Sequence, residues 1–266
     1  MTLLVIVPTR GRKVGCKRLL KSFTGTADFA ELVFVTDPDD EKTYAGMNWG
    51  DAAQVTLSPR QPLSGKLNTT AKMFENDYDA IMWVADDHVF ETPHWDTVMT
   101  GVLESMGGSG ILYPDDKRRS DVPEVWMIST DIIRELWFSN PDLNHYYTDN
   151  SWAELGRRSG LIRRVPEVVI PHRHYSVDAK VKRDKTYTEA EKTWGASDQQ
   201  AFFAWRKNGL PVQVSQLRRK FNPDVTWVLG KVRELCGADH GPGDGSHLGD
   251  GASFHGPPEP VQCHVL

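Results

Sequence analysis

An apolar run over residues 80–85 leads directly into Asp86, Asp87 and His88, and this junction constrains the fold of the chain more than any other feature. A short apolar run bounded by polar residues predicts a buried strand. Asp is disfavoured in strands and costly to bury alone, so two at a strand end indicate a place where a positive group binds. A divalent metal fits because hard cations prefer carboxylate oxygens; the alternative interpretation is a turn with solvated Asp side chains.

Similar apolar runs recur along the first half of the chain and alternate with segments of helical periodicity. Buried strands are predicted at residues 3–7, 32–35, 54–57 and 80–85, and helices at residues 13–23 and 66–76. Strands that are apolar throughout and alternate with helices are typical of a parallel sheet covered on both faces. The predicted fold class is therefore α/β, with a Rossmann-like, mostly parallel central sheet, and Trp83 is expected in its core.

The second half of the chain has a less regular pattern. Helices are predicted at residues 97–106, 130–139, 149–159 and 226–235, and strands at residues 111–113, 125–129 and 165–170. A further helix over residues 197–207 is expected to begin at Ser197 as its N-cap and to end at the Asn-Gly pair of residues 208–209. The polar residues 184–194 are predicted to form a loop or lid, and the Gly-rich and Pro-rich residues 237–266 a flexible tail.

Composition narrows the class of protein and its compartment. The 266 residues carry a net charge of −5, which gives no overall attraction to nucleic acid or membranes. Three cysteines are too few for a disulfide framework and fit a reducing compartment. The apolar start lacks the basic flank of a signal peptide, and no run approaches the roughly 18 apolar residues of a membrane span. We therefore expect a soluble cytoplasmic protein.

Polar side chains follow three of the predicted strands at the point where each strand ends. Thr9 and Arg10 follow the first strand, Asp37 and Asp39 the second, and residues 86–87 the fourth. In open α/β sheets, ligands bind at the carboxyl ends of the strands. These side chains are therefore expected to form one site at a shared edge of the sheet.

Several segments carry motifs in a characteristic order. They are residues 5–12 (V-I-V-P-T-R-G-R), 37–40 (D-P-D-D), 65–68 (G-K-L-N), 80–87, 148–160 and 172–174 (H-R-H). This order resembles the GT-A-type glycosyltransferases that use nucleotide sugars, in the neighbourhood of family 2. There the segments supply two strand-end motifs, the D-x-D metal motif, an acceptor-side acid and a late histidine. The resemblance covers roughly residues 1–210, and the Trp-Asp pair of residues 95–96 is similar to small glycosyltransferases of bacteriophages.

The resemblance implies a GT-A fold and a metal-dependent, inverting transfer of a sugar from a nucleotide sugar, with UDP favoured, to an acceptor hydroxyl. It implies one catalytic domain over residues 1–236. Within it, about residues 1–100 would bind the nucleotide sugar and about residues 101–236 the acceptor. The acceptor is left open among a saccharide, a protein and a hydroxymethylated DNA base. A phage-encoded enzyme would act in the host cytoplasm.

Asp87 stands at the metal-binding position of the D-x-D motif, and the resemblance implies His172 or His174 as the late histidine ligand. A mixed oxygen and nitrogen ligand set favours Mn²⁺, with Mg²⁺ as the alternative. The sequence departs from the family motif because Ala85 replaces its first Asp. Asp86 would then meet the ribose, or the metal through a water.

Nucleotide recognition is expected at the first two strand ends and at the start of the helix that follows. The donor-binding candidates are Pro8, Thr9, Arg10, Asp37, Asp39, Lys66, Asn68 and Asp86. The resemblance implies that Asp37 or Asp39 accepts a hydrogen bond from a base N–H. Lys66 or Asn68, near a helix start, would reach the diphosphate or ribose. His88 would supply a further metal ligand or orient one.

An acceptor hydroxyl loses a proton as it attacks, and a carboxylate within hydrogen-bond reach serves as the general base. By resemblance Asp149 is the expected base, although an N-cap role favours Asp at such a position equally. Asp115 and Asp116 are the rival acids. Trp95 and Trp152 are acceptor-side candidates because aromatic rings stack on sugars.

Two other functions fit part of the pattern. A nucleotidyltransferase also uses strand-end carboxylates and Mg²⁺, and residues 11–15 partly match its Gly-rich, basic loop. A non-catalytic sugar-binding protein on a degenerate fold is the third interpretation. The basic residues at 157–158, 163–164 and 218–220 form either a phosphate-binding surface for DNA or a set of scattered solvated charges.

Overall fold

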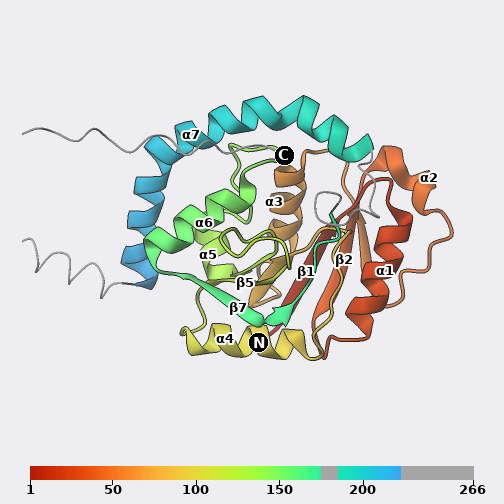
Figure 1. Ribbon diagram of the computed structural model, residues 1–266, viewed down its shortest axis with the longest axis horizontal. Coiled ribbons are helices and arrows are strands. Elements are labelled where there is room, and N and C mark those ends of the chain that lie inside the picture. The colour runs from red at the N-terminus through yellow and green to blue at the C-terminus, as the bar shows by residue number, and fades with distance from the viewer. Residues whose placement is uncertain (175–184, 223–266) are drawn as a thin grey trace, which may run out of the picture. The chain divides into compact units, whose positions relative to one another are not determined.

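The computed structural model of the protein describes residues 1–174 and 185–222. Residues Met1–Pro223 form one compact unit built around a central sheet, as Figure 1 shows. The predicted helix at residues 226–235 and the predicted tail at residues 237–266 lie outside the described residues.

Seven strands and seven α-helices are assigned in the described ranges. The strands are β1 (Leu3–Pro8), β2 (Glu31–Thr36), β3 (Ala53–Thr56), β4 (Ala80–Trp83), β5 (Ile111–Asp115), β6 (Trp126–Ser129) and β7 (Ile162–Val169). The helices are α1 (Lys13–Thr24), α2 (Glu41–Tyr44), α3 (Leu63–Phe74), α4 (Trp95–Ser105), α5 (Thr130–Glu135), α6 (Thr148–Ser159) and α7 (Lys185–Phe221). A short 3₁₀ helix, η1 (Pro38–Asp40), precedes α2.

The strands form one sheet in the order β3-β2-β1-β4-β6-β5-β7. β1 pairs in parallel with β2 and β4, β2 with β3, and β5 with β7. Only β6 runs the other way, antiparallel to both β4 and β5. The carboxyl ends of the other strands therefore share one edge with the start of β6. These pairings confirm the predicted α/β, mostly parallel sheet.

The two faces of the sheet are covered by different helices because strand side chains alternate between faces. Leu4 and Ile6 belong to a core formed with α3, α5, α6 and α7. Leu3, Val5 and Val7 belong to a second core formed with α1, α2 and α4. Helices on both faces of the sheet agree with the prediction.

α7 departs most from the sequence prediction. Residues 184–194, predicted as a loop or lid, belong to this helix from Lys185 onward, and neither Ser197 nor residues 208–209 mark an end of it. A Gly inside a helix costs about 1 kcal/mol relative to Ala, whereas burying a Leu side chain contributes about 2 kcal/mol. Leu210 and Leu217 are both fully buried, so packing carries the helix past the Asn-Gly pair.

No helix within the described ranges has the length and apolar content needed to cross a membrane.

Candidate functional site

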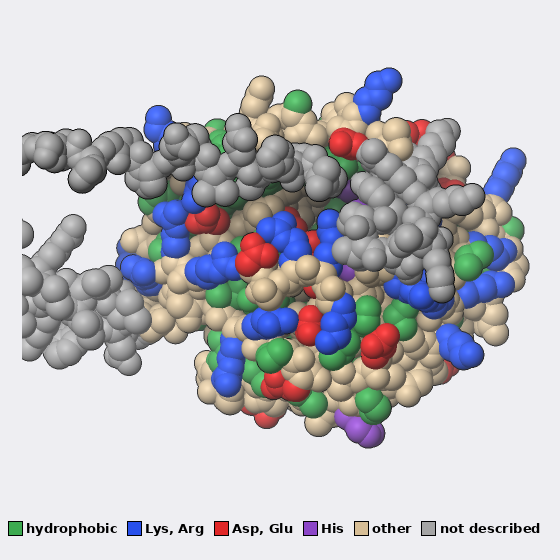
Figure 2. All heavy atoms as spheres, in the orientation of Figure 1, with side chains coloured by type: hydrophobic (Ala, Val, Ile, Leu, Met, Phe, Trp, Pro, Cys, Tyr) green, Lys and Arg blue, Asp and Glu red, His purple; other side chains and the backbone are tan. Residues whose placement is uncertain are grey.

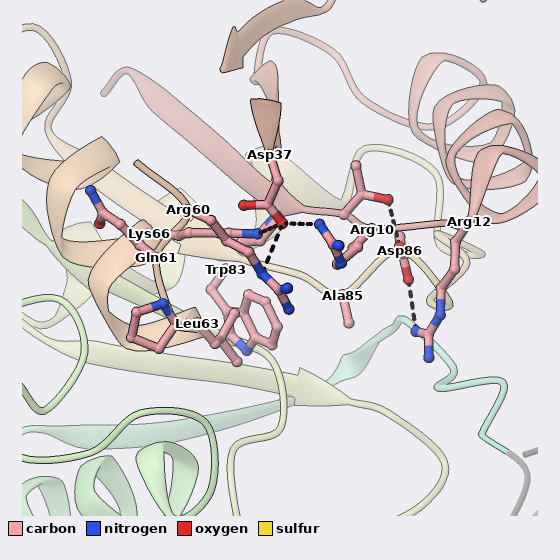
Figure 3. Close-up of a pocket in the computed structure, with 13 residues that line it drawn as sticks. Arg10, Arg12, Asp37, Arg60, Gln61, Leu63, Lys66, Trp83, Ala85 and Asp86 are labelled. Carbon is pink, nitrogen blue, oxygen red and sulfur yellow. Dashed lines mark hydrogen bonds and ion pairs between the residues drawn. The ribbon is translucent and has the colours of Figure 1, made fainter. Parts of the chain in front are cut away.

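A pocket lies at the carboxyl ends of β1, β2 and β4, next to the start of α3 (Figure 3). Its lining residues are Pro8, Thr9, Arg10, Arg12, Asp37, Arg60, Gln61, Pro62, Leu63, Lys66, Trp83, Ala85 and Asp86. The structure thus brings together six of the eight predicted donor-binding residues. Trp83, expected in the core, instead lies partly exposed in the pocket wall.

Asp37 organises the charges of this pocket. Its carboxylate is fully buried, and its Oδ2 accepts hydrogen bonds from Lys66 Nζ at 2.7 Å and Arg10 Nη1 at 3.1 Å. Arg60 Nε lies 4.0 Å from the same oxygen. Asp37 Oδ1 is buried without a hydrogen-bond partner among the described residues. Since a buried acceptor without a partner is costly, this oxygen favours a ligand that donates a hydrogen bond.

Asp86 forms the opposite wall and is held by protein groups on both oxygens. Thr9 Oγ1 donates to Oδ2 at 2.6 Å, and Arg12 Nη1 donates to Oδ1 at 3.0 Å. Burial raises the pKa of Asp86 to about 6, and the nearby Arg12 limits the rise. A Cβ on Gly15 would lie 2.7 Å from the backbone oxygen of Asp86, so α1 packs directly on the motif. Residues 13–15 therefore belong to the packed start of α1.

A cluster that can hold a metal lies beside the pocket. Asp87, His88 and His172 offer ligand atoms within 4.8 Å of one another. His172 Nε2 lies 3.1 Å from Asp87 Oδ1, and the His88 and His172 rings stack at a centroid distance of 4.2 Å. A backbone bridge between His88 and His172 joins the two segments. The His174 ring lies at a centroid distance of 5.0 Å from that of His172, and His174 is outside this cluster of three, so its role as a ligand stays a prediction.

The residues of this cluster fit a divalent cation. His88 Nε2 is buried and has no hydrogen-bond partner among the described residues. His172 Nδ1 lies 2.8 Å from Glu124 Oε2, so a carboxylate orients this ring with its other nitrogen toward Asp87. Burial lowers the pKa of His172, but hydrogen bonds to Asp87 and Glu124 raise it to about 9. A cation at Nε2 would take the place of that proton.

The sequence analysis did not identify Glu124. It precedes β6, and the antiparallel pairing of β6 with β4 sets Trp126 opposite Trp83, so Glu124 lies at the carboxyl end of β4. Trp83 Nε1 donates to the Glu124 carbonyl at 2.9 Å, and Arg118 pairs with its carboxylate at 2.6 Å. Burial raises the pKa of Glu124, but His172 and Arg118 lower it to about 2. No local motif signals this role.

Asp149 lies in the first turn of α6 and is half-buried. Its Oδ1 accepts a hydrogen bond from the backbone N–H of Asn150 at 2.8 Å. Burial, and then the charge of Glu124, raise the pKa of Asp149 to about 6. A carboxylate with this pKa is ionised at neutral pH and remains basic enough to accept a proton.

The two rival acids are engaged in structural contacts. Asp115 pairs with Lys117 at 2.9 Å and with Arg164 at 3.3 Å. Asp116 is buried, and its Oδ1 accepts hydrogen bonds from the backbone N–H groups of residues 118 and 119. Burial raises the pKa of Asp116, although these two hydrogen bonds oppose the shift. Asp149 therefore remains the candidate for proton transfer.

Three predicted site residues are structural instead. Trp95 is fully buried against Phe90, and Trp152 is fully buried with its Nε1 donating to a backbone carbonyl at 2.9 Å. The prediction of these rings as acceptor-side residues is therefore wrong. The Asn68 side chain bonds the backbone of residues 138–139 through both its oxygen and its nitrogen, which removes it from the nucleotide pocket.

Asp39 is also outside the pocket lining. Its half-exposed carboxylate forms a two-bond pair with Arg10, at 2.7 and 2.8 Å. Asp39 therefore supports the pocket through Arg10, while Asp37 faces it directly.

No family model and no curated protein matches the sequence. The structure of GalNAc-T7 with UDP, GalNAc and Mn²⁺ matches with a TM-score of 0.55 and 13% identity, over 84% of this chain and 54% of that chain. The chain has the GT-A fold. Glucosyl-3-phosphoglycerate synthase from Mycobacterium tuberculosis, with Mn²⁺, UDP and glucosyl-3-phosphoglycerate, matches at 0.50 and 14% identity, over 76% of this chain and 77% of that one.

A third GT-A structure, that of S. aureus TarS, matches with a TM-score of 0.50 and 15% identity. The match covers 64% of this chain but only 36% of the TarS chain. At these identities the likeness establishes the fold, and the function must be argued from the residues of the site.

Proposed function

We propose that this protein is a metal-dependent, inverting glycosyltransferase that moves a sugar from a UDP-sugar to an acceptor hydroxyl. One observation carries the proposal. A pocket with a free buried acceptor on Asp37 adjoins the metal-ligand cluster of Asp87, His88 and His172. The charge of Glu124, whose carboxylate contacts His172, contributes to the raised pKa of Asp149, the candidate base. In this proposal, donor, metal and acceptor chemistry meet at one edge of the GT-A sheet.

The donor base would bind in the pocket beside Asp37. Asp37 Oδ1 is free to accept the imide N–H of uracil, and Lys66 and Arg10 stand next to it as donors for base or phosphate oxygens. Trp83 offers an apolar wall. This arrangement supports UDP as the nucleotide.

Asp87, His172 and His88 would hold the metal, with Glu124 orienting His172. The mixed ligand set favours Mn²⁺ over harder cations. When bound, such an ion stabilises negative charge on a diphosphate leaving group. Arg12, which contacts Asp86 and Asp87, adds a fixed positive charge to the same place.

Asp149 would act as the general base toward the acceptor hydroxyl. Deprotonation of the attacking oxygen by a carboxylate permits direct displacement at the anomeric carbon, which inverts its configuration. The acceptor half would comprise about residues 101–236 and the nucleotide half about residues 1–100, both in one catalytic domain over residues 1–236.

The pairing of surface charges is the observation that bears on the class of acceptor. Figure 2 shows basic and acidic side chains interleaved on the face that it draws. Arg158 pairs with Glu154, Arg164 with Asp115, and Lys220 with Glu135. These pairs favour the interpretation of the basic runs as balanced surface charge over a DNA-phosphate surface, so a saccharide or protein acceptor is preferred to a modified DNA base.

The deciding experiment is a calorimetric and thermal-shift screen of UDP, GDP, UDP-glucose, UDP-galactose and UDP-GlcNAc, each with Mn²⁺ or with EDTA. We expect UDP and one UDP-sugar to bind in the presence of Mn²⁺ and to lose affinity with EDTA. Binding of none of them would contradict the proposal. Release of pyrophosphate from a nucleoside triphosphate would identify a nucleotidyltransferase, and binding without transfer a non-catalytic sugar-binding protein.

A further inference from the structure

Asp198 is a fully buried carboxylate on α7 that the proposed chemistry does not use. Its Oδ1 accepts hydrogen bonds from Asn144 N at 3.0 Å and Asn144 Nδ2 at 2.9 Å. Its Oδ2 accepts hydrogen bonds from His145 N and Tyr146 N, both at 2.8 Å. One buried anion therefore holds three consecutive backbone amides, and hydrogen bonds to a charged acceptor are the strong ones.

The segment that Asp198 holds leads directly into the first turn of α6, where Asp149 lies. Tyr147, between them, has φ of +65°, a conformation that a residue other than Gly adopts only when its surroundings impose it. Its ring stacks on Phe202 of α7 at a centroid distance of 5.1 Å. Asp198 and Phe202 are four residues apart, so they lie on one face of α7. α7 thus fixes the start of α6 with one polar and one aromatic contact.

The same segment is also tied to the nucleotide half. Ser64 N donates to the Asn144 carbonyl at 3.0 Å, and Asn68 bonds the backbone of residues 138–139. Both residues are on α3, which carries Lys66 into the nucleotide pocket. The segment over residues 138–147 is therefore held between α3 and α7, on the way to Asp149.

We propose that Asp198 is a positioning residue that fixes the backbone of residues 144–146 and thereby sets the place of Asp149 in the site. The inference rests on the proposed function, since it gives Asp149 the role of base. Asp198 itself is neither among the pocket-lining residues nor a member of the metal-ligand cluster.

Asp96 on α4 provides a matched control. It is also fully buried, and its carboxylate accepts hydrogen bonds from the backbone N–H groups of Asp28, Phe29, Ala30 and Thr97 at 2.8 to 3.1 Å. Residues 28–30 precede β2, so this contact lies at the amino edge of the sheet, opposite the site. Both carboxylates accept hydrogen bonds from consecutive backbone amides, but Asp198 holds the segment before Asp149, whereas Asp96 holds the segment before β2.

The test compares the Asp198→Asn, Asp198→Ala and Asp96→Asn variants of the full chain by carboxyl NMR titration and amide hydrogen exchange. In Asp198→Asn we expect the pKa of Asp149 to fall by about one unit or more as its turn loosens, and the amides of residues 144–151 to exchange at least about tenfold faster. Asp198→Ala should show larger changes of the same kind. Asp96→Asn should leave both readouts at their wild-type values, even if its melting temperature falls.

Two results would overturn the inference. One is an unchanged Asp149 pKa and unchanged exchange in the folded Asp198→Asn protein, which keeps the shape of the side chain if Asp198→Ala does not fold. The other is an equal change in Asp96→Asn, which would make the effect one of general stability. UDP titration with Mn²⁺ separates this failure from that of the proposed function. If wild-type protein does not bind UDP, the donor assignment fails, whereas the Asp149 readouts still decide whether Asp198 positions that turn.

Discussion

The nucleotide pocket and the metal-ligand cluster are neighbours on one sheet edge, yet their carboxylates are held in different ways. Asp37 is paired with Lys66 and Arg10, of which the Arg10 guanidinium stays charged at every physiological pH, whereas burial lowers the pKa of Lys66. Asp87 instead faces His172 and His88, whose nitrogens can exchange a proton for a metal. The charges of the pocket are therefore paired within the protein, whereas the cluster offers ligand atoms that a cation would complete.

The largest effect is expected at Asp149, which belongs to neither region. Asp149→Asn should lower turnover of the UDP-sugar about a thousandfold, because a carboxamide cannot accept the acceptor proton. UDP affinity and Mn²⁺ affinity should both stay unchanged in calorimetry. Asp142→Asn, an exposed carboxylate in the preceding segment, is the matched control and should retain full turnover. Loss of UDP binding in Asp149→Asn would contradict the separation of the base from the other two regions.

The stability of Asp149→Asn gives a second check on the same residue. Burial raises the pKa of Asp149 from 3.8 to about 6, so the folded protein binds the proton more tightly than the unfolded chain. The stability that this proton gives is lost as the pH rises between these two values, and the loss is complete at pH 7. Removing the charge should leave the melting temperature at pH 7 equal to or higher than that of the wild type. A clear fall would indicate that Asp149 acts mainly as a helix cap.

The next largest effect separates the role of the metal-ligand cluster from that of the nucleotide pocket. His172→Ala should lower metal-dependent turnover by about a hundredfold or more, and Mn²⁺ should no longer raise UDP affinity, because the cluster loses a ligand that Glu124 orients. UDP binding measured in EDTA should be nearly the same in both proteins. His94→Ala, at an exposed histidine on the far edge, should behave as wild type. Equal Mn²⁺ responses in His172→Ala and wild type would remove the cluster from the donor site.

A substitution in the nucleotide pocket should have a smaller effect, and it should change UDP binding in place of the Mn²⁺ response. Asp37→Asn should weaken UDP binding by about tenfold to about a hundredfold, because the amide cannot balance Lys66 and Arg10 or accept as strongly from the base. Mn²⁺ binding alone should not change. Asp39→Asn removes an exposed carboxylate from the same arginine and should cost less than about fivefold. If Asp39→Asn weakens UDP binding more than Asp37→Asn does, the uracil base is bound by Asp39 and not by Asp37.

The smallest effect is a pH dependence near pH 6, where Asp86 also titrates, so loss of this dependence in Asp149→Asn is what assigns it to Asp149. Its carboxylate must be ionised to act as a base, and its pKa of about 6 predicts that turnover rises with pH and levels off above about pH 7. Below the midpoint, turnover should fall about tenfold per pH unit. The measurement is turnover at saturating donor and Mn²⁺ across this range. A profile that is flat down to about pH 4.5 would assign the base to a carboxylate with an ordinary pKa.

The donor side of the site could be predicted from the sequence because short, apolar strands end at the residues that matter. The runs before Thr9, Asp37 and Asp86 are continuous and buried, and parallel pairing brings their ends together. The helix that carries Lys66 was also predicted, although it starts three residues earlier, at Leu63. Strand ends are local features, and a local pattern is enough to find them.

The acceptor side could not be predicted to the same depth because its geometry depends on long-range pairing. Glu124 reaches His172 only because β6 inserts antiparallel between β4 and β5. Trp95 and Trp152 are close in sequence to site residues, but their helices turn them into the core. Proximity in sequence to a site residue predicts where the backbone lies, but it does not predict the direction of the side chain.

The register of the antiparallel strand β6 also determines the geometry of the candidate metal cluster. Its register with β4 runs from Ala80 opposite Ser129 to Trp83 opposite Trp126. A slip of one residue would move Glu124 by about 3.3 Å and turn each β6 side chain to the other face. The 2.8 Å contact between Glu124 and His172 would not survive it. The orientation of His172 in the cluster therefore depends on the register of the hydrogen bonds between β4 and β6, although neither strand contains a residue of the cluster.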